Sequence, residues 1–163
     1  SEIKLLMPIL LDFIKLMKQK YSDMTYVFHS TQNFSQLQQS LSKEKNLSNC
    51  EVISDDKIKS HILQKSIFAV TKSGTVSLEI SNAKIPSIVF YKMGYINFLI
   101  VKSLVKTKYA NIINFAANEE IIPELLQSKC NAKNIFDHVD SFLENPDKIN
   151  KQVEKVQSIL NKL

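Results

Sequence analysis

A serine, a glycine and a threonine separate a short apolar run from a helical pattern near the middle of the chain: Ser73, Gly74 and Thr75. The apolar run at residues 67–70 is typical of a buried strand, and residues 75–83 carry a helical pattern. A strand-to-helix turn leaves backbone N–H groups free at the start of the helix, which is where phosphates bind. The two hydroxyls and the glycine allow close approach of an anion, so we predict a phosphate-binding turn here.

Glu79 follows Thr75 by four residues, so both side chains fall on the same face of the predicted helix. Its carboxylate could accept hydrogen bonds from a ribose diol. In the alternative interpretation, Thr75 only caps the helix and Glu79 only favours the helix dipole. The turn is neither a Walker A loop nor a G-x-G-x-x-G motif, because the chain contains two glycines in all. The turn by itself leaves both interpretations open.

Extended and helical patterns alternate along the whole chain. We expect strands at residues 24–29, 50–53, 67–71, 87–91 and 111–115. We expect helices at residues 3–20, 31–45, 55–64, 75–83, 94–106, 119–127, 131–143 and 147–162. Asn118 should cap the helix at 119–127, and Asn145 with Pro146 should begin the last helix. This alternation predicts an α/β fold, in which helices cover both faces of a Rossmann-like parallel sheet of about five strands.

The predicted sheet places further polar residues near the turn. In open α/β sheets, ligands bind beyond the carboxyl ends of the strands. Besides the turn, those ends fall at residues 29–30 and 54–55, at Lys92 with Met93, and at Asn114. His29 is expected to be a polar loop residue and not a base. We therefore expect the binding residues to come mainly from these strand ends.

Composition narrows the possible partners. With 163 residues, 44% of them hydrophobic, the chain should form a single domain over residues 1–163. All 21 basic residues are lysines, and the net charge is +5. The chain therefore has no guanidinium group to form the paired hydrogen bonds by which arginine recognises guanine, and we expect no nucleic-acid partner. The two cysteines have no histidines at metal-ligand spacing, so we expect reduced thiols and no metal. We see no signal peptide or membrane span, although Lys102, Lys106 and Lys108 could face an anionic lipid or a phosphate.

An ordered set of short blocks surrounds the turn. The blocks are SGTVSLE at 73–79, AKIP at 83–86, VFYKM at 89–93, VKSLVKTKY at 101–109, Asn114, and EIIPELLQ at 120–127. Together with SEIKLLMP at residues 1–8, this set resembles the carboxyl-terminal half of the lipid-A-disaccharide synthases. The resemblance spans nearly the whole chain and is densest at residues 73–127.

That family consists of inverting, metal-independent glycosyltransferases with two Rossmann-like domains, the GT-B type, and needs no cofactor. The resemblance implies transfer of diacylglucosamine from UDP-2,3-diacylglucosamine to lipid X. The products would be lipid A disaccharide 1-phosphate and UDP. It also implies a cytoplasmic location, with peripheral contact at the inner face of the inner membrane.

The resemblance implies a role for each matching position. Residues 73–75 would bind the diphosphate of the UDP-sugar donor, and Glu79 would bind its ribose. Lys92 and Met93 would lie near the uridine. Asn114 matches an asparagine that is important for donor binding or turnover, which makes it the catalytic candidate on this chain.

One departure from the family limits what the chain can do by itself. The family's glycine-serine-arginine loop directly precedes the helix that begins here at Ser1, and no arginine replaces it. We expect the acceptor pocket and the general base to lie on an amino-terminal Rossmann domain, supplied in cis or in trans. The 163-residue chain should then bind UDP weakly without catalysing transfer, and disaccharide formation by it would contradict this expectation.

Two further points concern partners and alternatives. The last helix, at residues 147–162, carries an apolar stripe that would by default pack on the core of the chain itself. Alternatively, the stripe would contact the missing domain or a second subunit, and the second case would give a homodimer. A UDP-sugar epimerase fragment is an alternative function, which the block at residues 101–109 argues against. A non-catalytic interaction domain of the same fold is another.

Overall fold

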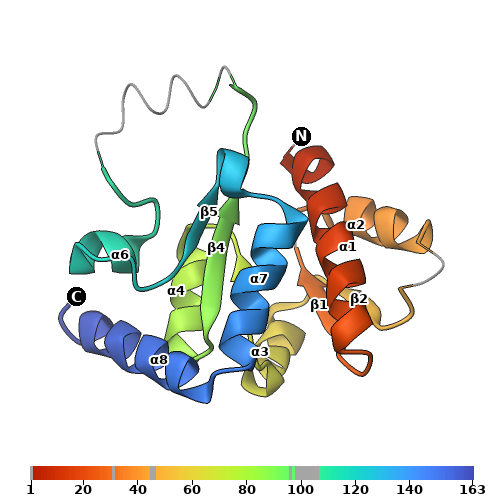
Figure 1. The fold of residues 1–163 in the computed structure, drawn as a ribbon. Helices are drawn as coiled ribbons and strands as arrows, with labels where there is room; N and C mark the ends of the chain where they lie inside the picture. The colour runs from red at the N-terminus through yellow and green to blue at the C-terminus, as the bar shows by residue number, and fades with distance from the viewer. Residues whose placement is uncertain (1, 31, 45–46, 96, 98–106) are drawn as a thin grey trace. The chain divides into compact units, whose positions relative to one another are not determined.

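The computed structural model describes residues 2–30, 32–44, 47–95, 97 and 107–163 (Figure 1). The chain divides into two compact units, Ser1–Lys65 and Ser66–Leu163, each of which contains parallel strands flanked by helices. Five strands occur among the described residues, and every pair of neighbouring strands is parallel. The predicted Rossmann-like α/β fold class is therefore confirmed.

The first unit contains two strands and three helices. Its elements are α1 (Glu2–Lys20), β1 (Tyr26–His29), α2 (Phe34–Ser42), β2 (Cys50–Ile53) and α3 (Asp56–Lys65). Strand β1 pairs with β2 in parallel, with Tyr26 opposite Cys50. Helix α1 continues through Pro8 and buries apolar side chains, among them Ile14 and Met17.

Polar side chains in the first unit are engaged in local structure. The carboxylate of Asp55 accepts hydrogen bonds from the backbone N–H groups of Lys57, at 2.7 Å, and Ile58, at 3.4 Å. Asp55 thus caps the start of α3. His29, at the carboxyl end of β1, has its Nε2 atom 3.6 Å from a carboxylate oxygen of Asp56. This contact places His29 in an ion pair within its own unit whenever the ring is protonated.

The second unit contains a three-stranded sheet in the order β3-β4-β5. Its elements are β3 (Ala69–Thr71), α4 (Thr75–Asn82), β4 (Ser87–Tyr91), α6 (Ile112–Ala117), β5 (Glu124–Leu126), the 3-10 helix η1 (Gln127–Lys129), α7 (Ala132–Leu143) and α8 (Pro146–Leu160). Helices α4 and α7 both contact the central strand β4 (Figure 1). Residues 87–90 of β4 are all buried, so both faces of this strand are covered.

Two predicted elements of the second unit are wrong. Residues 111–115 were expected to form a strand, but the side chain of Asn111 accepts a hydrogen bond from the N–H of Ile113 at 2.9 Å and begins α6. Asn118 was expected to begin a helix, but with φ of 50° it ends α6 in the left-handed conformation. The helix expected at 119–127 is replaced by β5, since Pro123 disfavours helical backbone at the residue before it.

One core cluster of the second unit lies between β4, the α6–β5 segment and α8. Val89, Ile113, Ile122 and Val156 form a buried cluster, and Leu160 is among the side chains packed against it. Helix α8 begins as predicted, with Asn145 as N-cap and Pro146 in its first turn. Val156 and Leu160 of its apolar stripe therefore pack on the core of their own unit. Contact of this helix with another domain or a second subunit stays a prediction.

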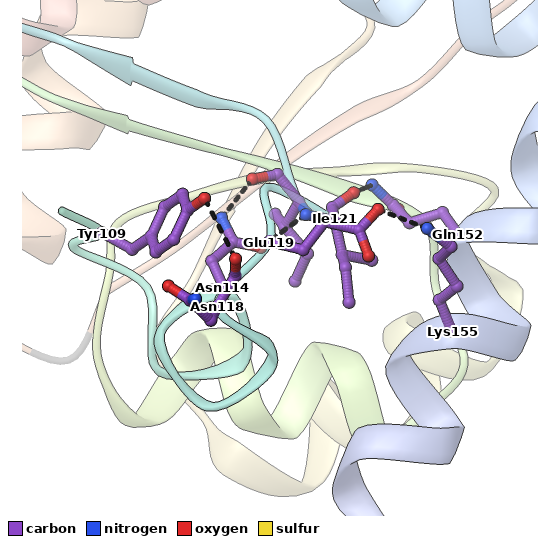
Figure 2. A network of polar contacts seen from close by, with 8 residues as sticks. Tyr109, Asn114, Asn118, Glu119, Ile121, Gln152 and Lys155 are labelled. Carbon is purple, nitrogen blue, oxygen red and sulfur yellow. Dashed lines mark hydrogen bonds and ion pairs between the residues drawn. The ribbon is translucent and has the colours of Figure 1, made fainter.

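A buried glutamine joins α8 to the sheet. The side-chain oxygen of Gln152 accepts from the N–H of Ser87 at 2.8 Å, and its NH₂ group donates to the carbonyl of Ser87 at 3.0 Å. The same NH₂ group donates to the carbonyl of Ile121 at 3.2 Å (Figure 2). These bonds satisfy buried backbone groups at the start of β4 and hold the segment before β5 against α8.

Within the described part of the chain, no helix has the length and apolar character needed to cross a membrane. Most of the helix predicted at 94–106, including Lys102 and Lys106, lies outside the described residues.

Candidate functional site

The turn between β3 and α4 depends on the backbone of Gly74. This residue is the N-cap of α4, with φ of 134° and ψ of −162°, a combination that is essentially restricted to glycine. A Cβ atom at this position would meet nothing within 4 Å, so the space over the backbone is open. No side chain caps α4, and the alternative in which Thr75 acts as the cap is wrong. The start of α4 is thus available to a ligand.

A pocket of about 390 Å³ lies at this turn. One wall consists of Ser73, Gly74, Thr75 and Leu78, and the other consists of residues 107, 109–112 and 115. The structure therefore brings three predicted binding residues together in one cavity. The second wall was not predicted. It contributes an exposed phenylalanine, Phe115, of which 57% is accessible to solvent.

The other predicted binding residues do not line this pocket. Glu79 is exposed on α4, one turn of helix after Thr75. Lys92 and Met93 directly follow β4 and are half-buried. Because β3 and β4 are parallel neighbours, Lys92 and Met93 follow at the same edge of the sheet as the turn, as predicted. Their contacts with a ligand stay a prediction.

Asn114 lies in α6, and not at the end of a strand as the sequence predicted. Its side chain is fully buried and makes four hydrogen bonds, of which the one with Ile121 can be followed in Figure 2. The oxygen accepts from the N–H groups of Ile121, at 2.8 Å, and Ile122, at 2.9 Å. The NH₂ group donates to the carbonyl of Ile122 at 2.6 Å and to Glu124 at 2.8 Å. All the hydrogen-bonding capacity of this amide is used within the protein.

Sequence reasoning missed Glu124, the first residue of β5. The residue is 8% exposed, and its carboxylate accepts hydrogen bonds from the backbone N–H groups of Ala110, at 2.8 Å, and Asn111, at 3.0 Å, besides the one from Asn114. Ala110 and Asn111 belong to the second wall of the pocket. A signal for this residue was present in the sequence. Pro123 is typical of the start of a strand, and a strand predicted there would have placed the charged Glu124 within an otherwise apolar stretch of the sheet.

Gln127 is a second residue that sequence reasoning missed. It directly follows β5 and adopts a φ of 52°, the left-handed conformation that is uncommon for a residue with a side chain. It therefore stands at the edge of the sheet where the ligand crevice is expected. The sequence placed it at the end of a helix, whereas in the structure it begins η1.

Lysines near the sheet edge and the pocket supply positive charge. Lys72 follows β3 and has its ammonium group 5.4 Å from the centre of the Tyr91 ring. Lys108 lies 5.0 Å from the ring of Tyr109, and hydrogen bonding to Tyr109 raises the pKa of this lysine, which stays a cation at neutral pH. These charges favour an anionic ligand at the turn.

The groups around the pocket favour binding over acid–base chemistry. None of the described residues that line it is acidic or a histidine. Burial raises the pKa of the Cys130 thiol, so this cysteine stays protonated and is a poor nucleophile. Within the described part of the chain, no group of three or more His, Cys, Asp or Glu side chains is placed to hold a metal ion. The arrangement can bind a phosphate and an adjacent, partly apolar group.

Comparison with known proteins identifies the family of the chain. The family model described as lipid-A-disaccharide synthetase matches residues 1–163. The chain is similar to the lipid-A-disaccharide synthase of Rickettsia prowazekii (strain Madrid E), with 34% identity over 163 residues that cover 100% of the chain and 42% of the relative. For the enzyme of Rickettsia bellii (strain OSU 85-389), identity is 39% over 112 residues, covering 69% of the chain and 29% of the relative.

A more distant relative gives the same result. The lipid-A-disaccharide synthase of Sulfurihydrogenibium sp. (strain YO3AOP1) is 30% identical over 153 residues, covering 88% of the chain and 39% of the relative. The chain thus spans less than half the length of these relatives. Because the family model matches from the first residue to the last, the chain belongs to the lipid-A-disaccharide synthetase family.

Proposed function

We propose that this chain is the donor-binding part of a lipid-A-disaccharide synthase. In the whole enzyme, an inverting and metal-independent glycosyltransferase of the GT-B type, diacylglucosamine would pass from UDP-2,3-diacylglucosamine to lipid X. The products would be lipid A disaccharide 1-phosphate and UDP. The family match over residues 1–163 and the names of the relatives support this proposal.

The turn at Gly74 is the observation that carries the proposal. The open space over its backbone and the uncapped start of α4 suit a diphosphate, which would accept hydrogen bonds from the backbone N–H groups of residues 73–75 and from the hydroxyl of Thr75. Glu79 would bind the ribose from the next turn of α4. Lys92 and Met93 would approach the uridine from the end of β4.

None of the described residues that line the pocket is acidic or a histidine, which fits a division of labour within the whole enzyme. We propose that the acceptor site and the general base are supplied by an amino-terminal Rossmann-like domain, in cis or in trans, and that this chain is inactive alone. Asn114 would contribute to donor binding or turnover through the backbone that it holds, since its amide is fully engaged. The whole enzyme would work at the cytoplasmic face of the inner membrane, with its lipid substrates.

Calorimetric titration of the 163-residue chain with UDP tests the proposal. We expect saturable one-site binding, and we expect Glu79→Gln to weaken it by about tenfold, the effect of losing one charge-assisted hydrogen bond to the ribose. Glu154→Gln is the matched control, because it removes the same charge from an exposed position on α8 and should leave the affinity unchanged.

Two outcomes would count against this function. Equal affinity of the Glu79→Gln variant and the unsubstituted chain would remove Glu79 from the site. No heat of binding at millimolar UDP would favour the alternative of a non-catalytic interaction domain that has kept the fold.

A further inference from the structure

We propose that Glu124 is a positioning residue for the phosphate-binding turn. Its buried carboxylate holds the segment of residues 110–114, and that segment in turn holds the backbone around Gly74. The role in nucleotide binding rests on the proposed function. The series of hydrogen bonds that connects Glu124 to the turn, called the link below, can be tested without any ligand.

The first step of the link is the environment of the carboxylate. Oε2 of Glu124 accepts from the N–H of Ala110, and Oε1 accepts from the N–H of Asn111 and from the side chain of Asn114. Three donors thus converge on one carboxylate that is 8% exposed. Since an ionised carboxylate offers acceptors only, it can face all three donors at once. A neutral amide would have to turn its own N–H donors toward at least one of them.

The second step joins the segment to the turn. The hydroxyl of Ser73 donates to the carbonyl of Ala110 at 2.5 Å. The side-chain NH₂ group of Asn111 donates to the hydroxyl of Ser77 at 3.2 Å, and that hydroxyl donates to the carbonyl of Gly74 at 2.7 Å. Every contact in this series lies within the second unit.

The two steps explain why a residue that does not line the pocket should control it. Ala110 and Asn111 lie on one wall of the pocket, and Ser73 and Gly74 lie on the other. The carboxylate of Glu124 fixes the first wall by bonding to its backbone N–H groups. The hydrogen bonds of Ser73 and Ser77 then hold the second wall in place relative to the first. Loss of the carboxylate should therefore loosen both walls while α7 and α8 keep their packing.

Amide hydrogen exchange of the ligand-free chain tests the link, with Glu124→Gln compared with Glu154→Gln as the charge-matched control. We expect protection to fall by about tenfold or more at Ala110, Asn111 and Ser77, as for loss of a buried charge-assisted hydrogen bond, with α7 and α8 unchanged. A change confined to residues 110–111, or an equal loss throughout the second unit, would overturn the proposal, because the first denies the link and the second shows a general structural role.

A milder variant covers the case in which Glu124→Gln does not fold. Ser77→Ala removes the hydroxyl that joins Asn111 to Gly74 and leaves the contacts of Glu124 intact. We expect faster hydrogen exchange of the backbone amide at position 77, which donates to the carbonyl of Gly74. The amides of Ala110 and Asn111 should stay protected from exchange. Unchanged protection at the turn would contradict the link.

Titration of the same variants with UDP separates this inference from the proposed function. Glu124→Gln and Ser77→Ala should each weaken UDP binding by about fivefold to tenfold, and the double variant should fall short of the product of the two, because both substitutions break one connected series of contacts. Effects that multiply would contradict the link. If the unsubstituted chain fails to bind UDP, the proposed function fails, and the exchange experiment still decides whether Glu124 positions the turn.

Discussion

Replacing Asn114 by alanine is expected to lower the free energy of unfolding of the second unit by about 3–5 kcal/mol. The substitution removes four hydrogen bonds from a fully buried position. It leaves the N–H groups of Ile121 and Ile122 without an acceptor, and it takes one of three donors from the Glu124 carboxylate. Because these groups are buried or partly buried, water cannot fully replace the lost partner.

Urea denaturation followed by circular dichroism measures this effect. Asn82→Ala is the matched control, since Asn82 is exposed at the end of α4, and it should change the stability by no more than about 0.5 kcal/mol. If Asn114→Ala were as stable as the control, the amide would not have the structural role described above. Such a result would leave Asn114 free to act directly on the substrate.

Replacing Gly74 by alanine is expected to weaken UDP binding by about tenfold or more, because the native backbone conformation costs a residue with a side chain about 1–3 kcal/mol. A Cβ atom would meet nothing within 4 Å, so crowding by neighbours is excluded as the cause. The strain would be relieved by rotation of the turn, which would redirect the N–H groups at the start of α4 away from the diphosphate.

The second glycine of the chain supplies the control. A Cβ atom at Gly94 also meets nothing within 4 Å, and Gly94 does not adopt the positive φ of Gly74. Calorimetry should therefore show that Gly94→Ala binds UDP like the unsubstituted chain. Equal affinity of Gly74→Ala and Gly94→Ala would show that the backbone of Gly74 is not needed for binding.

Local signals in the sequence were sufficient for most elements. The strands at 50–53 and 87–91 were predicted with the bounds that the structure has, and Asn145 with Pro146 marked the start of α8. These segments carry strong apolar patterns and clear capping residues, which act within a few residues of the chain.

Residues 111–127 could not be predicted in this way. A short apolar run such as residues 112–115 is compatible with a strand or a helix, and the choice depends here on contacts between distant residues. Asn114 bonds to Glu124 ten positions further on, and Asn111 reaches Ser77 across 34 positions. Local patterns carry no information about such bonds.

The same distinction applies to the site. The turn at residues 73–75 was predicted because a glycine between a strand and a helix is a local signal. The opposite wall, at residues 107–115, is brought there by the tertiary fold, and so is the carboxylate of Glu124 that holds it. The turn at residues 73–75 was therefore accessible from the sequence, whereas the shape of the pocket was not.

Titration of the isotopically labelled chain with UDP, followed by the backbone amide resonances, tests the phosphate-binding turn most directly. We expect the largest saturable changes at Gly74, Thr75 and Val76, at the start of α4, and we expect pyrophosphate to reproduce them while uridine does not. Saturable changes elsewhere with none at these three amides, or no change at millimolar UDP, would contradict a diphosphate site at this turn.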